Sequence, residues 1–291
     1  MTIKHLVISG GGPTLIHVLG AIQQLEKQEF ICLKNIETIY GTSAGAIVGV
    51  LICLGYDWET INDYIIKRPW HDVFPIKVQS IFDAYTKKGI FDISTIEKCF
   101  KPLLDAKDIS MSITLEEFFA LSHIELHLFS FEMNEYKMHD ISYLTHPNLS
   151  LIQAIQMTCS LPLLISPVCI DDKCYIDGGV FCNYPLNYCI ESGKSLDEIL
   201  GFKNNYCSDN IIINTDSTLM DFLLSFIFKA VFSVNTDHNQ PALKNEVICD
   251  AKNLSIDVLR SAINNIDVRR ELYSDGVASA IRFLSYLENS V

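Results

Sequence analysis

The segment that most constrains the fold begins as a short β-rich run, Ile36–Tyr40, and continues directly into Gly41-Thr42-Ser43-Ala44-Gly45. The apolar run Ala46–Leu54 follows and predicts a buried helix. A strand, a G-x-S-x-G turn and a helix together form the context in which this motif presents a nucleophilic serine. The glycines leave room for a sharp turn that lifts Ser43 above the strand end. At the helix N-terminus, free N–H groups and the helix dipole favour a developing negative charge.

The same segment has a second interpretation, because Thr42 and Ser43 are also good N-cap residues for an ordinary helix. G-x-S-x-G alone is a common pattern. The choice between a nucleophile and a helix cap therefore depends on the partners that the rest of the chain supplies.

A similar unit comes earlier in the chain. Lys4–Ser9 is a predicted strand that ends at Gly10-Gly11-Gly12, and the apolar residues from Leu15 to Leu25 have helical spacing. Such a turn presents backbone N–H groups to an anion, either a phosphate or an oxyanion. Neither G-x-x-x-x-G-K-[ST] nor G-x-G-x-x-G is present, which disfavours a nucleotide. We therefore favour an oxyanion hole for an anion that Ser43 generates.

The strands that lead into the two turns are joined by one helical crossover. Strands connected in this way are normally parallel neighbours, and ligands bind beyond their carboxyl ends. We therefore expect the glycine turn and Ser43 to meet at one edge of a sheet.

A carboxylate follows a later predicted strand. Val168–Ile170 and Cys174–Ile176 are typical of a tight hairpin that turns at residues 171–173, and the second strand runs into Asp177-Gly178-Gly179. Asp-Gly pairs commonly form turns in which the Asp bonds its own backbone. We favour a functional carboxylate, because a third strand-end motif would meet the other two at the same edge.

The most hydrophobic stretch is Leu219–Val234. It is too short for a transmembrane helix and carries Asp221 and Lys229. A buried core helix is the favoured interpretation, and an exposed apolar flap that docks on a lipid surface is the alternative. Other patterns predict helices over Glu59–Lys67, Ser94–Leu104, Leu115–Leu121 and Ser150–Thr158, and strands over Glu125–Met133 and Tyr136–Ser142.

The composition fits one globular unit, since 49% of the 291 residues are hydrophobic. A formal net charge of −13 argues against nucleic-acid binding and against simple electrostatic adhesion to anionic membranes. Any membrane contact should then be apolar and local. Met1–Ser9 passes straight into the glycine turn without the features of a secretory signal. We therefore expect a cytoplasmic protein, peripheral at membranes, and the alternative is a protein delivered by a route that leaves no cleavable signal.

The ten cysteines include no C-x-x-C pair, and we expect reduced thiols, several of them buried. A zinc site from Cys169, Cys174 and Cys182 lacks the usual ligand spacing and is not expected.

Taken together, these residues resemble the patatin-like phospholipase family. The resemblance implies a three-layer α/β/α fold with a central, mostly parallel sheet. It implies a single domain over residues 1–291, with the motifs in a core of about residues 1–200 and a helical part over 201–291. The matching blocks follow the family's order: Gly10–Gly12 with Gly20, Gly41–Gly45, Ser160–Pro162 with Pro167, Asp177–Gly179 with Asn183 and Pro185, and a looser Leu272…Gly276.

The resemblance also implies a lipid acyl hydrolase of phospholipase A type that acts on glycerophospholipids or related acyl esters, without a metal or organic cofactor. Ser43 would be the nucleophile and Asp177 the base of a Ser–Asp dyad. Amides of Gly10, Gly11 and Gly12, helped by Ala44 N–H, would hold the oxyanion. Supporting positions of the motifs are Gly41, Gly45, Gly178 and Gly179.

The chain departs from the family's pattern at two consecutive positions after the glycine run. The family commonly has Arg or Lys two residues after the glycine run, followed by Gly, whereas this chain has Thr14 and Leu15. Thr14 is the only support for a non-catalytic relative that binds lipid or a protein partner. An acyltransferase would use the same acyl-enzyme, and the sequence does not separate it from a hydrolase.

An α/β-hydrolase esterase is the remaining alternative, because Ser43, Asp177 and His238 occur in the order of its Ser–Asp–His triad. Two observations disfavour it. The G-x-S-x-G turn follows only two readable strands, and His238 lies in an ordinary polar turn. The other seven histidines precede Asp177, and we expect them to be structural or solvated.

Overall fold

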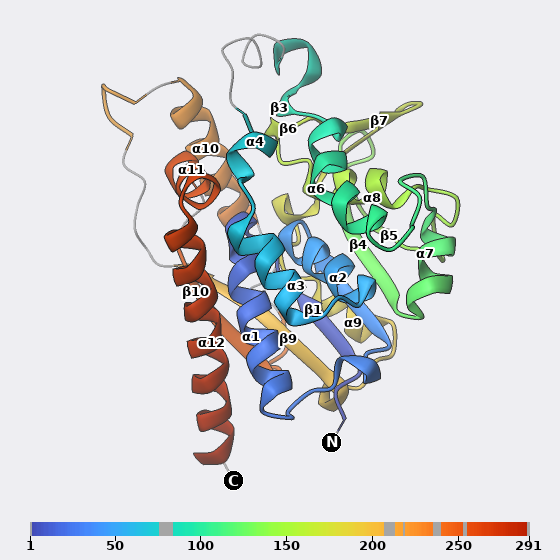
Figure 1. Ribbon diagram of the computed structural model, residues 1–291. Coiled ribbons are helices and arrows are strands. Elements are labelled where there is room, and N and C mark those ends of the chain that lie inside the picture. The colour runs from blue at the N-terminus through green and yellow to red at the C-terminus, as the bar shows by residue number, and fades with distance from the viewer. Residues whose placement is uncertain are drawn as a thin grey trace.

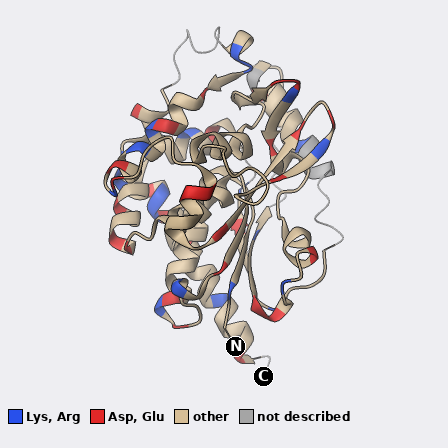
Figure 2. Ribbon diagram, turned by 90° about the vertical axis from the view of Figure 1, so that its right-hand side faces the viewer, with Lys and Arg blue, Asp and Glu red and all other residues tan. Residues whose placement is uncertain are grey.

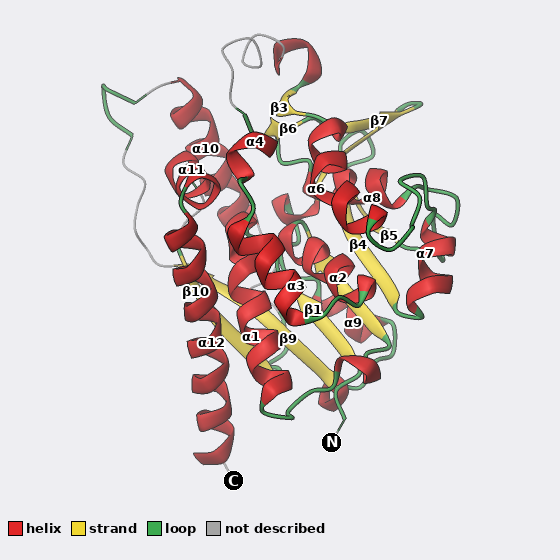
Figure 3. Cartoon of the chain, in the orientation of Figure 1, coloured by secondary structure: helices red, strands yellow, loops and turns green. Residues whose placement is uncertain are grey.

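The computed structural model describes residues 2–75, 84–206, 213–217, 219–234, 240–252 and 255–289. Within these ranges, eight strands form a central sheet that has helices on both faces, and two further strands form a small separate sheet (Figures 1 and 3). The central strands are β1 (His5–Ile8), β2 (Thr38–Thr42), β4 (Glu125–Glu132), β5 (Lys137–Ile141), β7 (Val168–Ile170), β8 (Lys173–Asp177), β9 (Ile199–Tyr206) and β10 (Glu246–Ala251), and the small sheet is β3 (Gly89–Phe91) with β6 (Leu163–Ile165).

Five of these strands run parallel, in the order β10-β9-β1-β2-β4. The predicted α/β fold with a mostly parallel sheet is confirmed. The two strands that carry the glycine turns are parallel neighbours as predicted, with His5 opposite Thr38 and Ile8 opposite Gly41. Their following turns therefore lie at the same edge of the sheet.

The expectation of a helical part over residues 201–291 is wrong in one respect, because that part also supplies β10 and most of β9. Both strands extend the central sheet on the far side of β1, where His5 is opposite Ile199 and Ile8 is opposite Phe202. The end of β9 is polar, which conceals the hydrophobic pattern of a buried parallel strand. Pairing with β1, far away in the sequence, defines it as a strand.

The strand β4 brings the ends of β2 and β8 together. Along one side, β4 pairs with β5. Along the other side it pairs with β2 as far as Thr42, opposite Phe129, and then with β8 from Asp177, opposite Ser130. Because β8 is antiparallel to β4, β2 and β8 run toward each other and meet end to end. This meeting places the residue after Thr42 beside Asp177.

Apolar side chains cover both faces of the sheet, as expected for buried parallel strands. Leu6 and Ile8 join the larger core under α1, α2, α8 and α12, whereas Val7 joins a smaller core under α9 (Figure 1). The described helices are α1 (Leu15–Lys27), α2 (Ala44–Leu54), α3 (Trp58–Asn62), α4 (Trp70–Val73), α6 (Ile93–Asp105), α7 (Leu115–Ser122), α8 (Leu151–Cys159), α9 (Leu186–Glu191), α10 (Leu219–Val234), α11 (Ile256–Asn264) and α12 (Ile266–Asn289).

The helix α10 combines both interpretations of its sequence. Leu224 and Phe228 are buried, whereas Leu219, Phe222 and Phe226 are 74%, 51% and 64% exposed. The helix packs beside Gly178–Val180, the turn that follows Asp177. Of the helices that the structure describes, none combines the length and the hydropathy needed to cross a bilayer. Figure 2 shows acidic residues spread over the outer helices and loops, with basic residues between them.

Candidate active site

Ser43 occupies a strained turn between β2 and α2. Its backbone has φ 52° and ψ −118°, a conformation that non-glycine residues rarely adopt. The motif glycines allow α2 to pack directly on the strands, since a Cβ at Gly45 would lie 2.3 Å from Ile8 O and one at Gly41 2.7 Å from Ala46 N. The Ser43 side chain makes no helix-capping hydrogen bond. The geometry is that of a nucleophile elbow and not of an ordinary helix cap.

The hydroxyl of Ser43 instead donates a hydrogen bond to Asp177, with 2.6 Å between Oγ and Oδ2. The second carboxylate oxygen, Oδ1, accepts from Gly179 N at 2.7 Å. Asp177 is only 4% exposed, and burial raises its pKa to about 6, although the hydrogen bonds from Ser43 and Gly179 oppose the rise. The carboxylate is therefore held beside Ser43 as a stronger base than an ordinary aspartate.

Backbone and hydroxyl contacts fix both members of this pair. Asp177 N donates to Ser160 O at 3.0 Å, and Ser43 N donates to Thr158 Oγ1 at 2.9 Å. The Thr158 hydroxyl in turn donates to Phe129 O on β4 at 2.6 Å. Thr158, near the end of α8, thus links Ser43 to β4, and Ser160 holds the backbone of Asp177.

The glycine turn lies against Ser43, because a Cβ at Gly10 would be 3.1 Å from Ser43 Cβ. Gly10 N donates to Asn183 O at 3.0 Å, which revises the expectation that Gly10 supplies an amide to an oxyanion. Among the described residues, the N–H groups of Gly11 and Gly12 have no acceptor. Ala44 N belongs to the first residue of α2, where helix amides have no intrahelical partner. These three amides are free to bind an anion.

Asn204 and Tyr206, which surround the glycine turn together with Thr14, were not predicted from the sequence. Thr14 is 6% exposed, and its Oγ1 accepts from Asn204 Nδ2 at 2.9 Å. Asn204 and Tyr206, both on β9, also donate to Gly10 O, at 2.8 and 3.2 Å. Their alternating spacing at a strand end is a signal that could have pointed to them, had β9 been recognised as a strand.

Two alternative sites were considered from the sequence, a triad that includes His238 and a zinc site that includes Cys169 and Cys174. His238 lies outside the described residues. Cys169 and Cys174 face each other across the β7–β8 hairpin, with 2.7 Å between their Sγ atoms. Across the described ranges, no three or more His, Cys, Asp and Glu side chains are grouped in a way that could hold a metal ion.

A model of the patatin-like phospholipase family matches residues 6–190. The chain belongs to this family. The match contains the glycine turn, the Ser43 elbow, the Ser160–Pro162 block and Asp177, and it ends before β9. The prediction made from the motifs is therefore confirmed for the family and its fold.

Viral and fungal proteins are among the relatives. The chain is 28% identical over 190 residues to a probable lipid hydrolase of Invertebrate iridescent virus 6, covering 65% of this chain and 63% of that protein. It is 25% identical over 224 residues to an uncharacterized protein of Acanthamoeba polyphaga mimivirus, covering 76% of this chain and 72% of that one. A triacylglycerol lipase of Schizosaccharomyces pombe is 28% identical over 171 residues, covering 55% of this chain and 33% of the lipase.

Among solved structures, the crystal structure of VipD from Legionella pneumophila has the same fold. It aligns with a TM-score of 0.58 at 16% identity, covering 98% of this chain and 67% of VipD. Of the relatives above, the iridescent virus protein is named a probable lipid hydrolase and the fungal one a triacylglycerol lipase.

Proposed function

We propose that the protein is a lipid acyl hydrolase of phospholipase A type, which cleaves fatty-acyl esters of glycerophospholipids through Ser43 and Asp177. The observation that carries the proposal is the 2.6 Å hydrogen bond from Ser43 Oγ, at a strained elbow, to a buried carboxylate. A serine in this position needs a base that removes its proton, and Asp177 is the group within reach.

In the proposed reaction, Asp177 Oδ2 takes the Ser43 proton while Oγ attacks the ester carbonyl carbon. The carbonyl oxygen becomes an oxyanion, which the N–H groups of Gly11, Gly12 and Ala44 stabilise. Collapse of the tetrahedral intermediate breaks the bond to the alcohol oxygen, which takes the proton from Asp177 and leaves as a lysophospholipid. Water that gives a proton to Asp177 then attacks the acyl carbon of the acyl-Ser43 ester. The bond from this carbon to Ser43 Oγ breaks, Oγ takes the proton back from Asp177, and the fatty acid is released.

The main difficulty of a Ser–Asp pair is the weak basicity of a carboxylate, whose ordinary pKa is about 3.9. Burial of Asp177 reduces this difficulty, since it raises the pKa to about 6. This value approaches that of the histidine in a conventional triad, about 6.5. Asp177 therefore gains basicity yet remains ionised at neutral pH.

We further propose that the enzyme contacts a lipid surface through Leu219, Phe222 and Phe226 of α10. These side chains are exposed on a helix that packs beside the turn after Asp177. Replacing all three by Ser should lower hydrolysis of vesicle lipids but not of a soluble short-chain ester. Tyr286→Ser on α12, also at an exposed aromatic side chain, is the matched control. Equal losses on both substrates would contradict this contact.

The decisive experiment measures fatty-acid release from mixed phospholipid vesicles in the presence of EDTA. Wild type should release fatty acid, Ser43→Ala and Asp177→Asn should not, and His238→Ala should retain the activity. Loss of activity in His238→Ala would favour a triad. Absence of release from wild type, with vesicle binding intact, would instead support a non-catalytic lipid-binding protein.

A further inference from the structure

The carbonyl group of Gly10 has an unusual number of hydrogen-bond donors. Asn204 Nδ2 lies 2.8 Å from the oxygen, Asn183 Nδ2 lies 3.1 Å from it, and the Tyr206 hydroxyl lies 3.2 Å from it. A carbonyl oxygen has two lone pairs, so three donors saturate it. The direction of this carbonyl is therefore strongly determined.

The direction of the carbonyl also fixes the next amide. The described chain has no cis peptide bond, so Gly11 N–H points opposite to Gly10 C=O, away from Asn204 and Tyr206. Glycines rotate freely, and this turn has no side chain of its own to hold the peptide plane. The glycine turn therefore depends on neighbouring side chains for its orientation.

Thr14 connects this arrangement to the segment that follows the glycine turn. Its buried hydroxyl accepts from Asn204 Nδ2 at 2.9 Å. Asn204 turns Nδ2 toward Gly10 O, since the reversed amide would bring its oxygen against the carbonyl oxygen, and Asn204 Oδ1 is buried without a hydrogen-bond partner among the described residues. A Cβ at Gly11 would lie within 2.7 Å of the side chains of Thr14, Asn204 and Tyr206, which shows how closely these three surround the turn.

We propose that Asn204 is a positioning residue that, with Tyr206 and Thr14, locks the Gly10–Gly11 peptide so that Gly11 N–H faces the oxyanion. The proposal rests on the proposed acyl-transfer function of Ser43. Asn204 and Tyr206 lie beyond residues 6–190, the region that matches the family model. The chain thus fixes its oxyanion hole from β9 with uncharged groups.

The test compares Asn204→Leu with Asn205→Leu. Leucine has nearly the shape of asparagine but cannot donate to Gly10 O. Asn205 is the neighbouring residue on β9, is exposed, and donates to Asp250 instead. With a soluble short-chain ester, Asn204→Leu should lower kcat about 10- to 100-fold with little change in KM, since loss of one oxyanion donor lowers kcat by about 100- to 1,000-fold. Asn205→Leu should leave kcat within about twofold.

A second pair of variants tests the contact of Thr14. Thr14→Ser keeps an acceptor for Asn204, whereas Thr14→Val has the same shape as threonine without one. The Val variant should have a several-fold lower kcat than the Ser variant, at the same thermal midpoint of unfolding. Equal kcat values would show that Asn204 does not need the hydroxyl of Thr14 and would overturn its part in the proposal.

A crystal structure of Asn204→Leu separates this proposal from the proposed function. A rotated Gly10–Gly11 peptide supports the positioning role, even if the wild type hydrolyses no ester and the proposed function fails. An unchanged peptide overturns the role, even if wild type is active and Ser43→Ala is not. An unchanged kcat in Asn204→Leu also overturns it when the wild type is active.

Discussion

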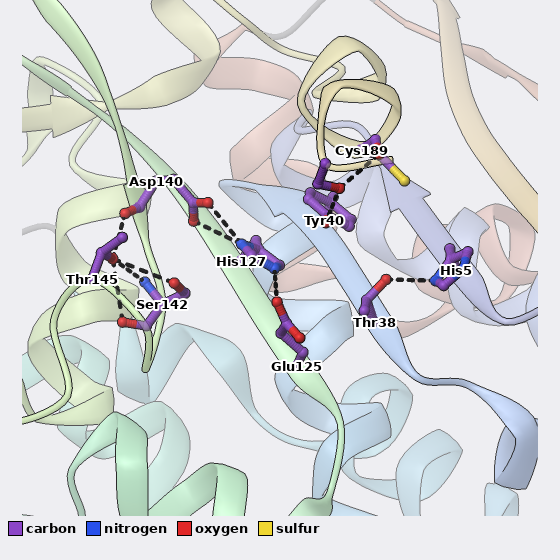
Figure 4. Close-up of polar contacts among 10 residues, drawn as sticks. His5, Thr38, Tyr40, Glu125, His127, Asp140, Ser142, Thr145 and Cys189 are labelled. Carbon is purple, nitrogen blue, oxygen red and sulfur yellow. Dashed lines mark hydrogen bonds and ion pairs between the residues drawn. The ribbon is translucent and has the colours of Figure 1, made fainter. Parts of the chain in front are cut away.

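Asp177 and His127 are buried ionisable residues placed along the same strand, β4, with opposite hydrogen-bonding arrangements. His127 lies on β4 itself, and Asp177 pairs with Ser130, three residues further on. The His127 ring is held between two carboxylates, with Nδ1 2.7 Å from Asp140 Oδ2 and Nε2 2.9 Å from Glu125 Oε1 (Figure 4). Among the described residues, the Asp177 carboxylate has only a hydroxyl and a backbone amide as hydrogen-bond partners.

The pKa values of the two residues follow from these partners. Burial disfavours the charged imidazolium, but Asp140 and Glu125 outweigh burial and raise the pKa of His127 to about 9. Burial of Asp177 is not compensated by a cation among its described hydrogen-bond partners, and its pKa rises to about 6. His127 is therefore a fully paired structural cation with no free nitrogen, whereas Asp177 retains basicity for chemistry.

The largest expected effect comes from Asp177→Asn. Hydrolysis should fall by more than about 1,000-fold, because the Ser43 proton loses its acceptor. The free energy of unfolding at pH 8 should rise on the order of 2 kcal/mol, because the variant no longer buries a charge whose pKa is shifted. Fatty-acid release and urea unfolding measure the two quantities. If Asp177→Asn loses both activity and stability, the contrast drawn between Asp177 and the carboxylate-paired His127 is contradicted.

His127→Gln should behave in the opposite way. It leaves two carboxylates without their cation, so the free energy of unfolding should fall by about 3 kcal/mol while kcat stays within about threefold. His71→Gln is the matched control, since His71 is exposed and should change stability by less than about 0.5 kcal/mol. A large loss of kcat in folded His127→Gln would show that this cluster takes part in catalysis.

Asp177 and His127 should each affect the free energy of unfolding over a different pH range. Both pKa values are raised in the fold, so each group stabilises the protein below its ordinary pKa and loses this contribution as the pH rises through the folded value. The window for Asp177 runs from 3.8 to about 6, and that for His127 from 6.5 to about 9. In Asp177→Asn, the free energy of unfolding should no longer decline over the first of these pH ranges. In His127→Gln, it should no longer decline over the second. In wild type, kcat/KM should rise with an apparent pKa of about 6 and then reach a plateau.

The smallest effect is expected from Tyr40→Phe. The Tyr40 ring stacks on His127 with 4.3 Å between ring centroids, and its hydroxyl lies 2.7 Å from Ser192 Oγ. Phenylalanine keeps the stacking and loses the hydrogen bond, so unfolding should become easier by about 1 kcal/mol without a change in kcat. Thermal unfolding measures the difference. A loss as large as that of His127→Gln would show that the hydroxyl, and not the paired carboxylates, stabilises this region.

The features that the sequence predicted are local ones. The Ser43 elbow, the glycine turn, and the hairpin that leads into Asp177 each occupy a few consecutive residues, so their turn chemistry can be read directly. The end-to-end meeting of β2 and β8 could not be predicted, because it depends on the register of both strands along β4. For the same reason, Asn204 and the Asp140 partner of His127 could be found only from the paired strands.

The position of β1 between β2 and β9 has a consequence for protein synthesis. The ribosome makes the elbow and the glycine turn early, but two donors to Gly10 O, Asn204 and Tyr206, and the second neighbour of β1 emerge only with residues 199–206. Contacts so distant in sequence form late in folding. We therefore expect the nascent chain to carry Ser43 and Asp177 before the β9 donors to Gly10 O are in place.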